Sequence, residues 1–171
     1  HPHSLWLLQE DAIPRVEQWF DSQQISAFRG SHSGYTRLVP PVRPVREIVL
    51  DKVRSGLLIR DSFTPLEVPH NVVTTLQIAP CVVVEKSSDG HILLISGDQR
   101  FSLTFEEIDS WNFEIFDSPV STSYGVLEAA KAFRWESLAE CKSTLTIYIS
   151  PEDTLSDYNY KQLFIDLNAI H

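Results

Sequence analysis

The chain of 171 residues lacks the features that mark membrane-spanning helices, disulfide frameworks and zinc sites. None of its apolar runs approaches the roughly 20 residues that a transmembrane helix needs, and residues 4–8 are too short for the core of a signal peptide. Its two cysteines, Cys81 and Cys141, lie far apart in strand-like segments, and we expect each to be a buried free thiol. Without a cysteine pair at metal-ligand spacing or an Asn-x-Ser/Thr sequon, the sequence predicts an intracellular protein with no zinc site.

The sequence also lacks a recognisable catalytic constellation. It has no phosphate-cradling glycine-rich loop and no His-Glu-x-x-His motif. Residues 30–34 resemble a nucleophile elbow, but His32 stands where acyl transfer requires a serine. Glu106 and Glu107 are adjacent, so on a helix they would diverge instead of converging as an acid/base pair. His1 and His3 sit at a terminus that we expect to be disordered. We therefore predict a protein that is not an enzyme and holds no metal or cofactor.

Positive charge is scarce, and its distribution is uneven. Residues 1–60 hold eight Lys/Arg against six Asp/Glu, whereas residues 61–171 hold six against seventeen, which together give the net charge of −9. Proteins that bind nucleic acid neutralise its phosphates with lysine and arginine. The acidic two-thirds of the chain is therefore better suited to a basic protein partner.

Two segments near the start of the chain show helical periodicity. Residues 10–24 are predicted to form a short helix because their apolar side chains recur at helical spacing. Residues 28–44 are rich in Gly, Ser and Pro and are expected to form a loop or linker. Residues 44–56 start with a proline and end with a glycine, and they carry one apolar stripe, which predicts a second helix. The stripes consist of Ile13, Val16, Trp19 and Phe20 in the first helix, and of Val45, Ile48, Val49 and Val53 in the second. We divide the chain into residues 1–43, an N-terminal helix and linker, and residues 44–171, a folded domain.

A β-meander follows. Residues 57–71 are expected to be irregular and largely extended. Residues 74–86 are rich in β-branched side chains and predict a strand, in which Pro80 marks a bulge, bend or edge. In residues 91–105, Phe101, Leu103 and Phe105 alternate with polar residues after a Gly97-Asp98 turn, which predicts a hairpin. Three such strands in sequence make a meander.

The remainder predicts one more helix and further strands. The first half of residues 105–117 is interpreted as a short helix. Residues 126–140 fit either a helix, because of their alanines, or a strand, and we favour the strand. Residues 143–149 alternate strictly and residues 161–170 end the chain as a strand. This order predicts a mainly β protein with an OB fold, a five-stranded Greek-key barrel with a helix after the third strand and N-terminal helices.

Three segments carry a resemblance to a known family. Residues 90–105 are similar to its central hairpin, residues 104–116 to the acidic helix and loop that follow, and residues 160–170 to its last barrel strand. The sequence resembles the OB domain of the shelterin subunit that bridges to the single-strand DNA binder and recruits telomerase. It also resembles the fungal relative of that subunit, the telomerase regulatory subunit of the "ever shorter telomeres" set.

The resemblance implies a nuclear protein that acts at telomeres and recruits or regulates telomerase by recognising a protein. By position, it implies an acidic surface for a basic partner, such as the reverse transcriptase or another telomere-complex subunit. The implied partner-binding residues are Glu106, Glu107, Asp109, Trp111, Glu114 and Asp117. The other interpretation of this segment is a solvated face with its aromatic residues in the core.

Two alternatives stay open. A single-stranded nucleic-acid-binding OB domain would stack bases on strand-borne aromatic rings and contact phosphates with arginines. Its candidates are Arg100, Phe133, Arg134 and Trp135, with Tyr148 and Phe164 as further rings, although core packing is the default role of such rings. The third possibility is a structural subunit of a larger complex that packs through its N-terminal helices.

Overall fold

The protein is seen in a computed structural model, which describes residues 12–64, 70–86, 91–106, 111–138 and 144–152. Strands dominate these residues, so the protein is mainly β, as the sequence predicts. In the part of the chain that the structure describes, no helix is long and apolar enough to span a membrane.

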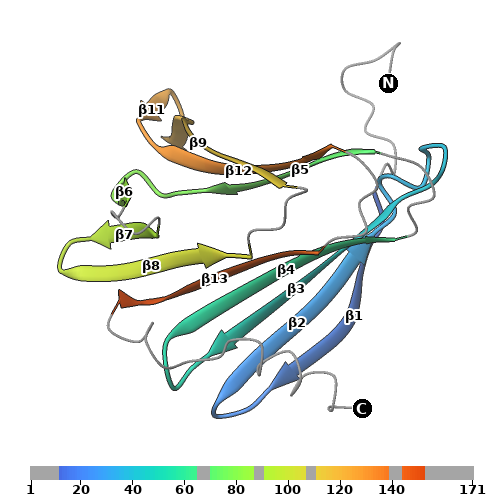
Figure 1. Ribbon diagram of the computed structural model, residues 1–171, viewed down its shortest axis with the longest axis horizontal. Helices are drawn as coiled ribbons and strands as arrows, with labels where there is room; N and C mark the ends of the chain where they lie inside the picture. The colour runs from blue at the N-terminus through green and yellow to red at the C-terminus, as the bar shows by residue number, and fades with distance from the viewer. Residues whose placement is uncertain (1–11, 65–69, 87–90, 107–110, 139–143, 153–171) are drawn as a thin grey trace.

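The strands form two facing sheets and one separate hairpin. The larger sheet contains, in spatial order, β1 (Pro14–Asp21), β2 (Ile25–His32), β3 (Arg43–Asp51), β4 (Gly56–Thr64), β13 (Leu145–Pro151), β8 (Gln99–Phe105), β7 (Ile92–Ser96) and β6 (Val83–Lys86). The smaller sheet contains β5 (Asn71–Gln77), β12 (Lys131–Leu138) and β9 (Trp111–Asp117), and β10 (Val120–Ser123) pairs with β11 (Val126–Glu128). All these pairings are antiparallel. The smaller sheet lies over part of one face of the larger sheet, which makes a β-sandwich (Figure 1).

The main core fills the space between the two sheets. Ile59 of β4 and Ile147 of β13 belong to the same buried cluster as Phe133 and Trp135 of β12. Phe133 and Trp135 are completely buried and meet edge to face at 6.1 Å between ring centroids. Burying an aromatic side chain of this size stabilises a fold by roughly 2–3 kcal/mol, so these rings are a major contribution to holding the sheets together.

The smaller sheet leaves part of the larger sheet's inner face open. We define the inner face as the face that carries Ile59. Ile48 lies opposite Ile59, Phe28 opposite Ile48 and Trp19 opposite Phe28, so these side chains share that face. The buried residues of the main core nevertheless come from β4, β7, β8, β13 and the smaller sheet, or adjoin them. Trp19 is 67% exposed, so the inner face of β1 and β2 is accessible.

The first predicted helix is wrong, because a β-bulge imitates helical spacing. Residues 14–21 form β1, whose register with β2 shifts between Val16 and Gln18. The extra residue turns Val16 and Trp19, three positions apart, toward the same face. A spacing of three on one face is the helical signature, whereas a regular strand places such residues on opposite faces.

The second predicted helix is wrong because β3 is an interior strand that carries apolar side chains on both faces, of which only the outer face is buried. Val45 and Val49 lie on the outer face and Ile48 on the inner face, so apolar residues recur without strict alternation. The glycine expected just after the helix, Gly56, instead starts β4. Between the strands, the buried carboxylate of Asp51 accepts hydrogen bonds from the backbone N–H groups of Val53 and Arg54, both at 3.0 Å.

The strand predictions after residue 74 hold better. The hairpin is confirmed as β7 and β8, with Gly97 at φ +58°, and β6, β7 and β8 form the expected meander. The strand at residues 126–140 is confirmed as β11 and β12, and the following strand is β13. Residues 74–86 do not form one strand: β5 and β6 belong to different sheets, and the chain changes sheet around Pro80. The extended segment after residue 57 is largely the regular strand β4.

The described strands do not form the predicted five-stranded OB barrel. They form an open sheet of eight strands facing one of three, because β1 to β4 pair in sequence and extend the sheet where helices were expected. The pairing of β2 with β3 continues this sheet across the proposed boundary at residue 43. Most of the helix expected early in residues 105–117 and the strand at residues 161–170 lie outside the described residues. Cys81 is exposed instead of buried, and Cys141 is outside the described residues.

Candidate functional site

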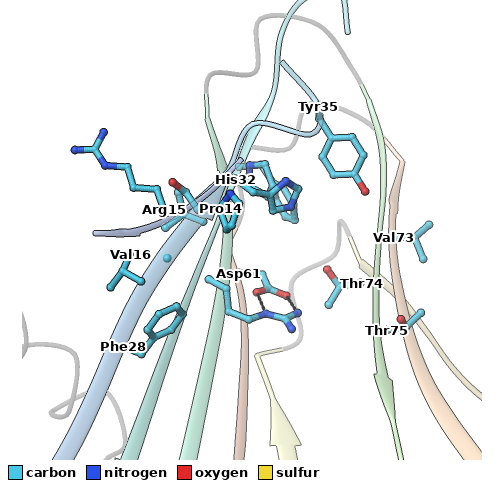
Figure 2. Close-up of a pocket in the computed structure, with 16 residues that line it drawn as sticks. Pro14, Arg15, Val16, Phe28, His32, Tyr35, Asp61, Val73, Thr74 and Thr75 are labelled. Carbon is cyan, nitrogen blue, oxygen red and sulfur yellow. Dashed lines mark hydrogen bonds and ion pairs between the residues drawn. The ribbon is translucent and has the colours of Figure 1, made fainter. Parts of the chain in front are cut away.

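A hollow of about 580 Å³ lies between the inner face of β1 to β4 and strand β5. We call it the β2–β5 hollow. Its volume lies within the range of small-molecule sites in proteins. Residues from strands β1 to β5 and from the turn after β2 line it, and among them are Phe28, His32, Tyr35, Arg46, Asp61 and Thr74. Figure 2 shows Val73, Thr74 and Thr75 on the side opposite Phe28 and Val16.

A glycine makes room for the aromatic floor of the hollow. Phe28 and Gly30 both face inward from β2, two residues apart, and the Phe28 ring lies over Gly30. A Cβ atom on Gly30 would stand 2.4 Å from Cζ of Phe28, which is far closer than carbon atoms approach. The ring can therefore occupy this place only because residue 30 has no side chain.

His32 and Tyr35 form the rim, where β2 ends in a turn. The Nδ1 atom of His32 accepts a hydrogen bond from the Gly34 N–H at 3.1 Å, so Nε2 carries the proton and is a donor. The His32 and Tyr35 rings are 5.5 Å apart, and Tyr35 is 48% exposed. The turn is held by the backbone N–H groups of Leu38 and Val42, which both donate to the Tyr35 carbonyl. This turn presents an imidazole and a phenol side by side.

Arg46 and Asp61 form an ion pair inside the hollow. The two residues lie opposite each other on β3 and β4. Arg46 donates from Nε and from Nη2 to the two carboxylate oxygens at 2.6 and 2.7 Å. These bonds raise the pKa of the Arg46 guanidinium above its ordinary value. The Asp61 side chain is 6% exposed and that of Arg46 is 44% exposed, so the guanidinium still faces solvent.

The hollow has polar groups but little net charge. Arg46 and Asp61 neutralise each other, and Figure 2 shows the Arg15 guanidinium pointing away from Asp61 and Tyr35. Hydrogen-bond donors and acceptors therefore surround an aromatic floor without a strong field of either sign. Such a set suits a molecule with many hydroxyl groups and an apolar face. Among the residues that the structure describes, no cluster of His, Cys, Asp and Glu could hold a metal ion.

Among the described residues of the acidic segment, Trp111 is not an exposed aromatic anchor. Trp111 is 9% exposed and packs in the main core, as in the alternative interpretation of this segment. Glu114 and Asp117 are exposed on β9, and Asp117 pairs with Lys131 at 2.7 Å. Glu106 is half-buried and precedes the undescribed residues, where Glu107 and Asp109 lie.

The residues singled out for nucleic acid are not stacking platforms. Phe133 and Trp135 are fully buried, and Tyr148 is 4% exposed, so core packing is their role. Arg134 pairs with Glu136 at 2.9 Å, and Arg100 pairs with Glu152 at 2.6 Å. Phe164 lies outside the described residues. The structure thus brings Phe133, Arg134 and Trp135 together on β12 but turns both rings inward.

Sequence reasoning did not find the β2–β5 hollow. Residues 28–44 have the composition of a linker, and their Gly-Ser-His-Ser-Gly run lacks the central serine that a nucleophile elbow requires. The run was still a signal, because a His and a Tyr three residues apart beside two glycines mark a tight, polar turn. Arg46 and Asp61 carried no local signal, since only the register of the β3–β4 hairpin brings them together.

Comparisons with known proteins give a match at the level of structure. No family model and no curated protein sequence matches the chain. The heparan sulfate lyase HepC from Pedobacter heparinus matches with a TM-score of 0.64 and 15% identity, over 81% of this chain and 21% of its own. A crystal structure of heparinase III matches with a TM-score of 0.62 and 9% identity, over 86% of this chain and 24% of its own.

The shared feature is the fold. At identities this low, the match shows that the β-sandwich shares its fold with a region of these enzymes. It does not show that the chain shares their activity. The chain spans about a fifth to a quarter of the length of these solved structures.

Proposed function

We propose that this domain binds a sugar chain without cleaving it, and that the β2–β5 hollow holds one sugar unit. The observation that carries this proposal is the convergence of His32, Tyr35 and the Arg46–Asp61 pair around the Phe28 ring. A pyranose has hydroxyl groups around its edge and C–H groups on its faces. The polar groups match its edge, and the aromatic ring matches a face.

The names of the structural neighbours suggest which sugars to consider. One neighbour is a heparan sulfate lyase and another a heparinase, so both are named for acidic polysaccharides. The backbone of such polymers contains a uronate, whose single carboxylate can accept a hydrogen bond from the remaining N–H groups of Arg46. We therefore propose a uronate-containing chain as the ligand.

Charge argues against a densely sulfated ligand. The protein carries a net charge of −9, and the hollow itself is close to neutral. A heavily sulfated chain would need several unpaired arginines or lysines on one surface, for the same reason that nucleic acid does. Arg29, Lys52 and Arg60 are instead paired with Glu17, Asp21 and Glu47. The preferred ligand therefore carries few sulfates.

The same pairing supports binding without cleavage. Elimination or hydrolysis in a sugar chain builds up charge in the transition state, which an enzyme stabilises with preorganised charges or dipoles. Asp61 cancels the positive charge of Arg46, so the hollow offers no net cation next to a uronate carboxylate. His32 and Tyr35 can hold hydroxyl groups in this environment without becoming an acid/base pair.

Calorimetric titration tests the proposal with heparosan oligosaccharides, which are the unsulfated uronate-containing backbone, and with heparin fragments of the same length. We expect heparosan to bind more tightly than heparin and no unsaturated uronate product to appear. Tyr35→Ala should weaken heparosan binding about fivefold to tenfold, because it removes one hydrogen bond and some apolar contact. Tyr124→Ala, which removes an exposed tyrosine from the β10–β11 turn, is the matched control. Tighter binding of heparin, or equal effects of the two variants, would contradict the proposal.

The telomeric role stays a prediction that neither the fold nor the comparisons test. It rested on an OB barrel, which the described strands do not form. Two of its acidic residues, Glu114 and Asp117, are exposed and can be tested directly. Reversing both charges would abolish capture of a basic partner if that interpretation holds.

A further inference from the structure

An exposed tryptophan continues the aromatic floor of the hollow along the open inner face. Trp19 lies directly opposite Phe28 in the β1–β2 pair, and the two rings meet edge-on at 6.4 Å with an interplanar angle of 67°. This contact covers little of Trp19, which stays 67% exposed. A tryptophan exposed to this degree leaves a large apolar surface in water, which is the common mark of a contact site.

The position of Trp19 depends on the bulge in β1. Without the register shift between Val16 and Gln18, Trp19 would face the opposite side of the sheet from Val16. With the shift, Val16 and Trp19 both face inward and are 64% and 67% exposed. The bulge thus places two apolar side chains in one row beside the hollow.

We propose that Trp19 is a second sugar-stacking position, so that the domain binds an extended chain in which one unit fills the hollow and a later unit lies on the indole. The proposal rests on the function proposed above. The Trp19 and Phe28 ring centroids are 6.4 Å apart, so a sugar unit on the indole is the direct neighbour of a unit stacked on Phe28 in the hollow. A single unit can occupy only one of the two rings, whereas a disaccharide reaches both.

The chemistry of this part of the face fits the alternation in a uronate polymer. The hollow offers polar partners, whereas Trp19 and Val16 themselves offer apolar contact; Asp21 is the next residue of β1 on this face, and Phe28 and Ser26 of β2 separate Trp19 from Leu50 of β3. A carboxylated unit therefore belongs in the hollow beside Arg46. An uncharged N-acetylated unit belongs on the indole, where its ring C–H groups lose water at little cost.

A length series separates this proposal from the one on which it rests. Glucuronate and the heparosan di- and tetrasaccharides are titrated into the full chain and into Trp19→Ala, with Leu127→Ala as a control that removes an exposed apolar side chain from β11. We expect wild-type affinity to rise about tenfold between glucuronate and the disaccharide. Trp19→Ala should lose that rise while keeping the glucuronate affinity, and Leu127→Ala should behave as wild type. A tryptophan fluorescence change upon binding should appear with the di- and tetrasaccharides and disappear in Trp19→Ala.

Three other results are informative. If the wild type binds no heparosan of any length, the proposed function fails and this inference fails with it. If the wild type binds but Trp19→Ala retains the full gain with length, the function stands and the stacking position is refuted, which is also the result expected of a protein-docking face. If Trp19→Ala loses glucuronate binding while its circular dichroism melt is unchanged, Trp19 belongs to the first position and the two-position account is overturned.

Discussion

Replacing Gly30 with alanine tests how the floor of the hollow is built. The new Cβ would lie 2.4 Å from Cζ and 2.9 Å from Cε1 of Phe28, so the ring must move away. Overpacking of this kind costs about 1–3 kcal/mol, and separating Phe28 from Trp19 costs about 0.5–1.5 kcal/mol more. Alanine also lowers the entropy of the unfolded chain, which returns up to about 1 kcal/mol. We expect Gly30→Ala to lower the free energy of unfolding by about 2 kcal/mol in urea denaturation and to weaken heparosan binding.

A double-mutant cycle identifies the cause of that loss. In a Phe28→Ala background the clash is gone, so adding Gly30→Ala should cost little further stability. An equal loss in both backgrounds would refute the account and point to the Arg15 carbonyl oxygen, which lies 3.3 Å from the new Cβ. Gly97→Ala is the control: Gly97 has φ +58° and open space around it, so it should lose about 1 kcal/mol from backbone strain alone and bind normally.

Two further predictions concern charges on the first strands. Arg46→Ala leaves the buried Asp61 carboxylate without its partner, so we expect the free energy of unfolding to fall by about 2 kcal/mol in urea denaturation. This is less than for a fully buried pair, because Arg46 is half exposed. Adding Asp61→Asn to the same chain should recover part of the lost stability. For Glu17, the hydrogen bond from Ser31 and then Arg29 lower the pKa below 4.5. The stabilising contribution of the Glu17 carboxylate is therefore present above pH 4.5 and is lost as the pH falls through the folded-state pKa. Glu17→Gln should then reduce the loss of stability on the acid side of a stability–pH curve. An unchanged acid side would contradict this.

Local patterns predicted the hairpin and failed for the first strands. In residues 101–105, apolar and polar side chains alternate strictly, and the turn residue Gly97 adopts the positive φ that its type suggests, so sequence and structure agree. In β1, the bulge breaks the alternation, and in β3 apolar residues stand on both faces, so each segment loses the period-2 signal of a strand. A single sequence carries no direct mark of a bulge, and the helical interpretation was the simpler one.

The candidate site was hidden for a different reason. Its polar groups come from residues 32, 35, 46 and 61, which only the pairing of β2, β3 and β4 brings together. The local sequence predicts a binding surface in the acidic run after residue 105, but an aromatic residue of that run, Trp111, packs in the core. Aromatic residues beside charges predict a surface only when the strand direction is known, because alternate residues face opposite sides.

A nuclear magnetic resonance titration with a heparosan tetrasaccharide tests the central claim most directly, because it locates the ligand as well as detecting it. The account predicts saturable shifts of the backbone amides of His32, Tyr35 and Thr74, while the amide of Tyr124 on the β10–β11 turn stays in place. Saturable shifts confined to the β9 strand around Glu114, or no saturable shift anywhere, would contradict a sugar site in the β2–β5 hollow.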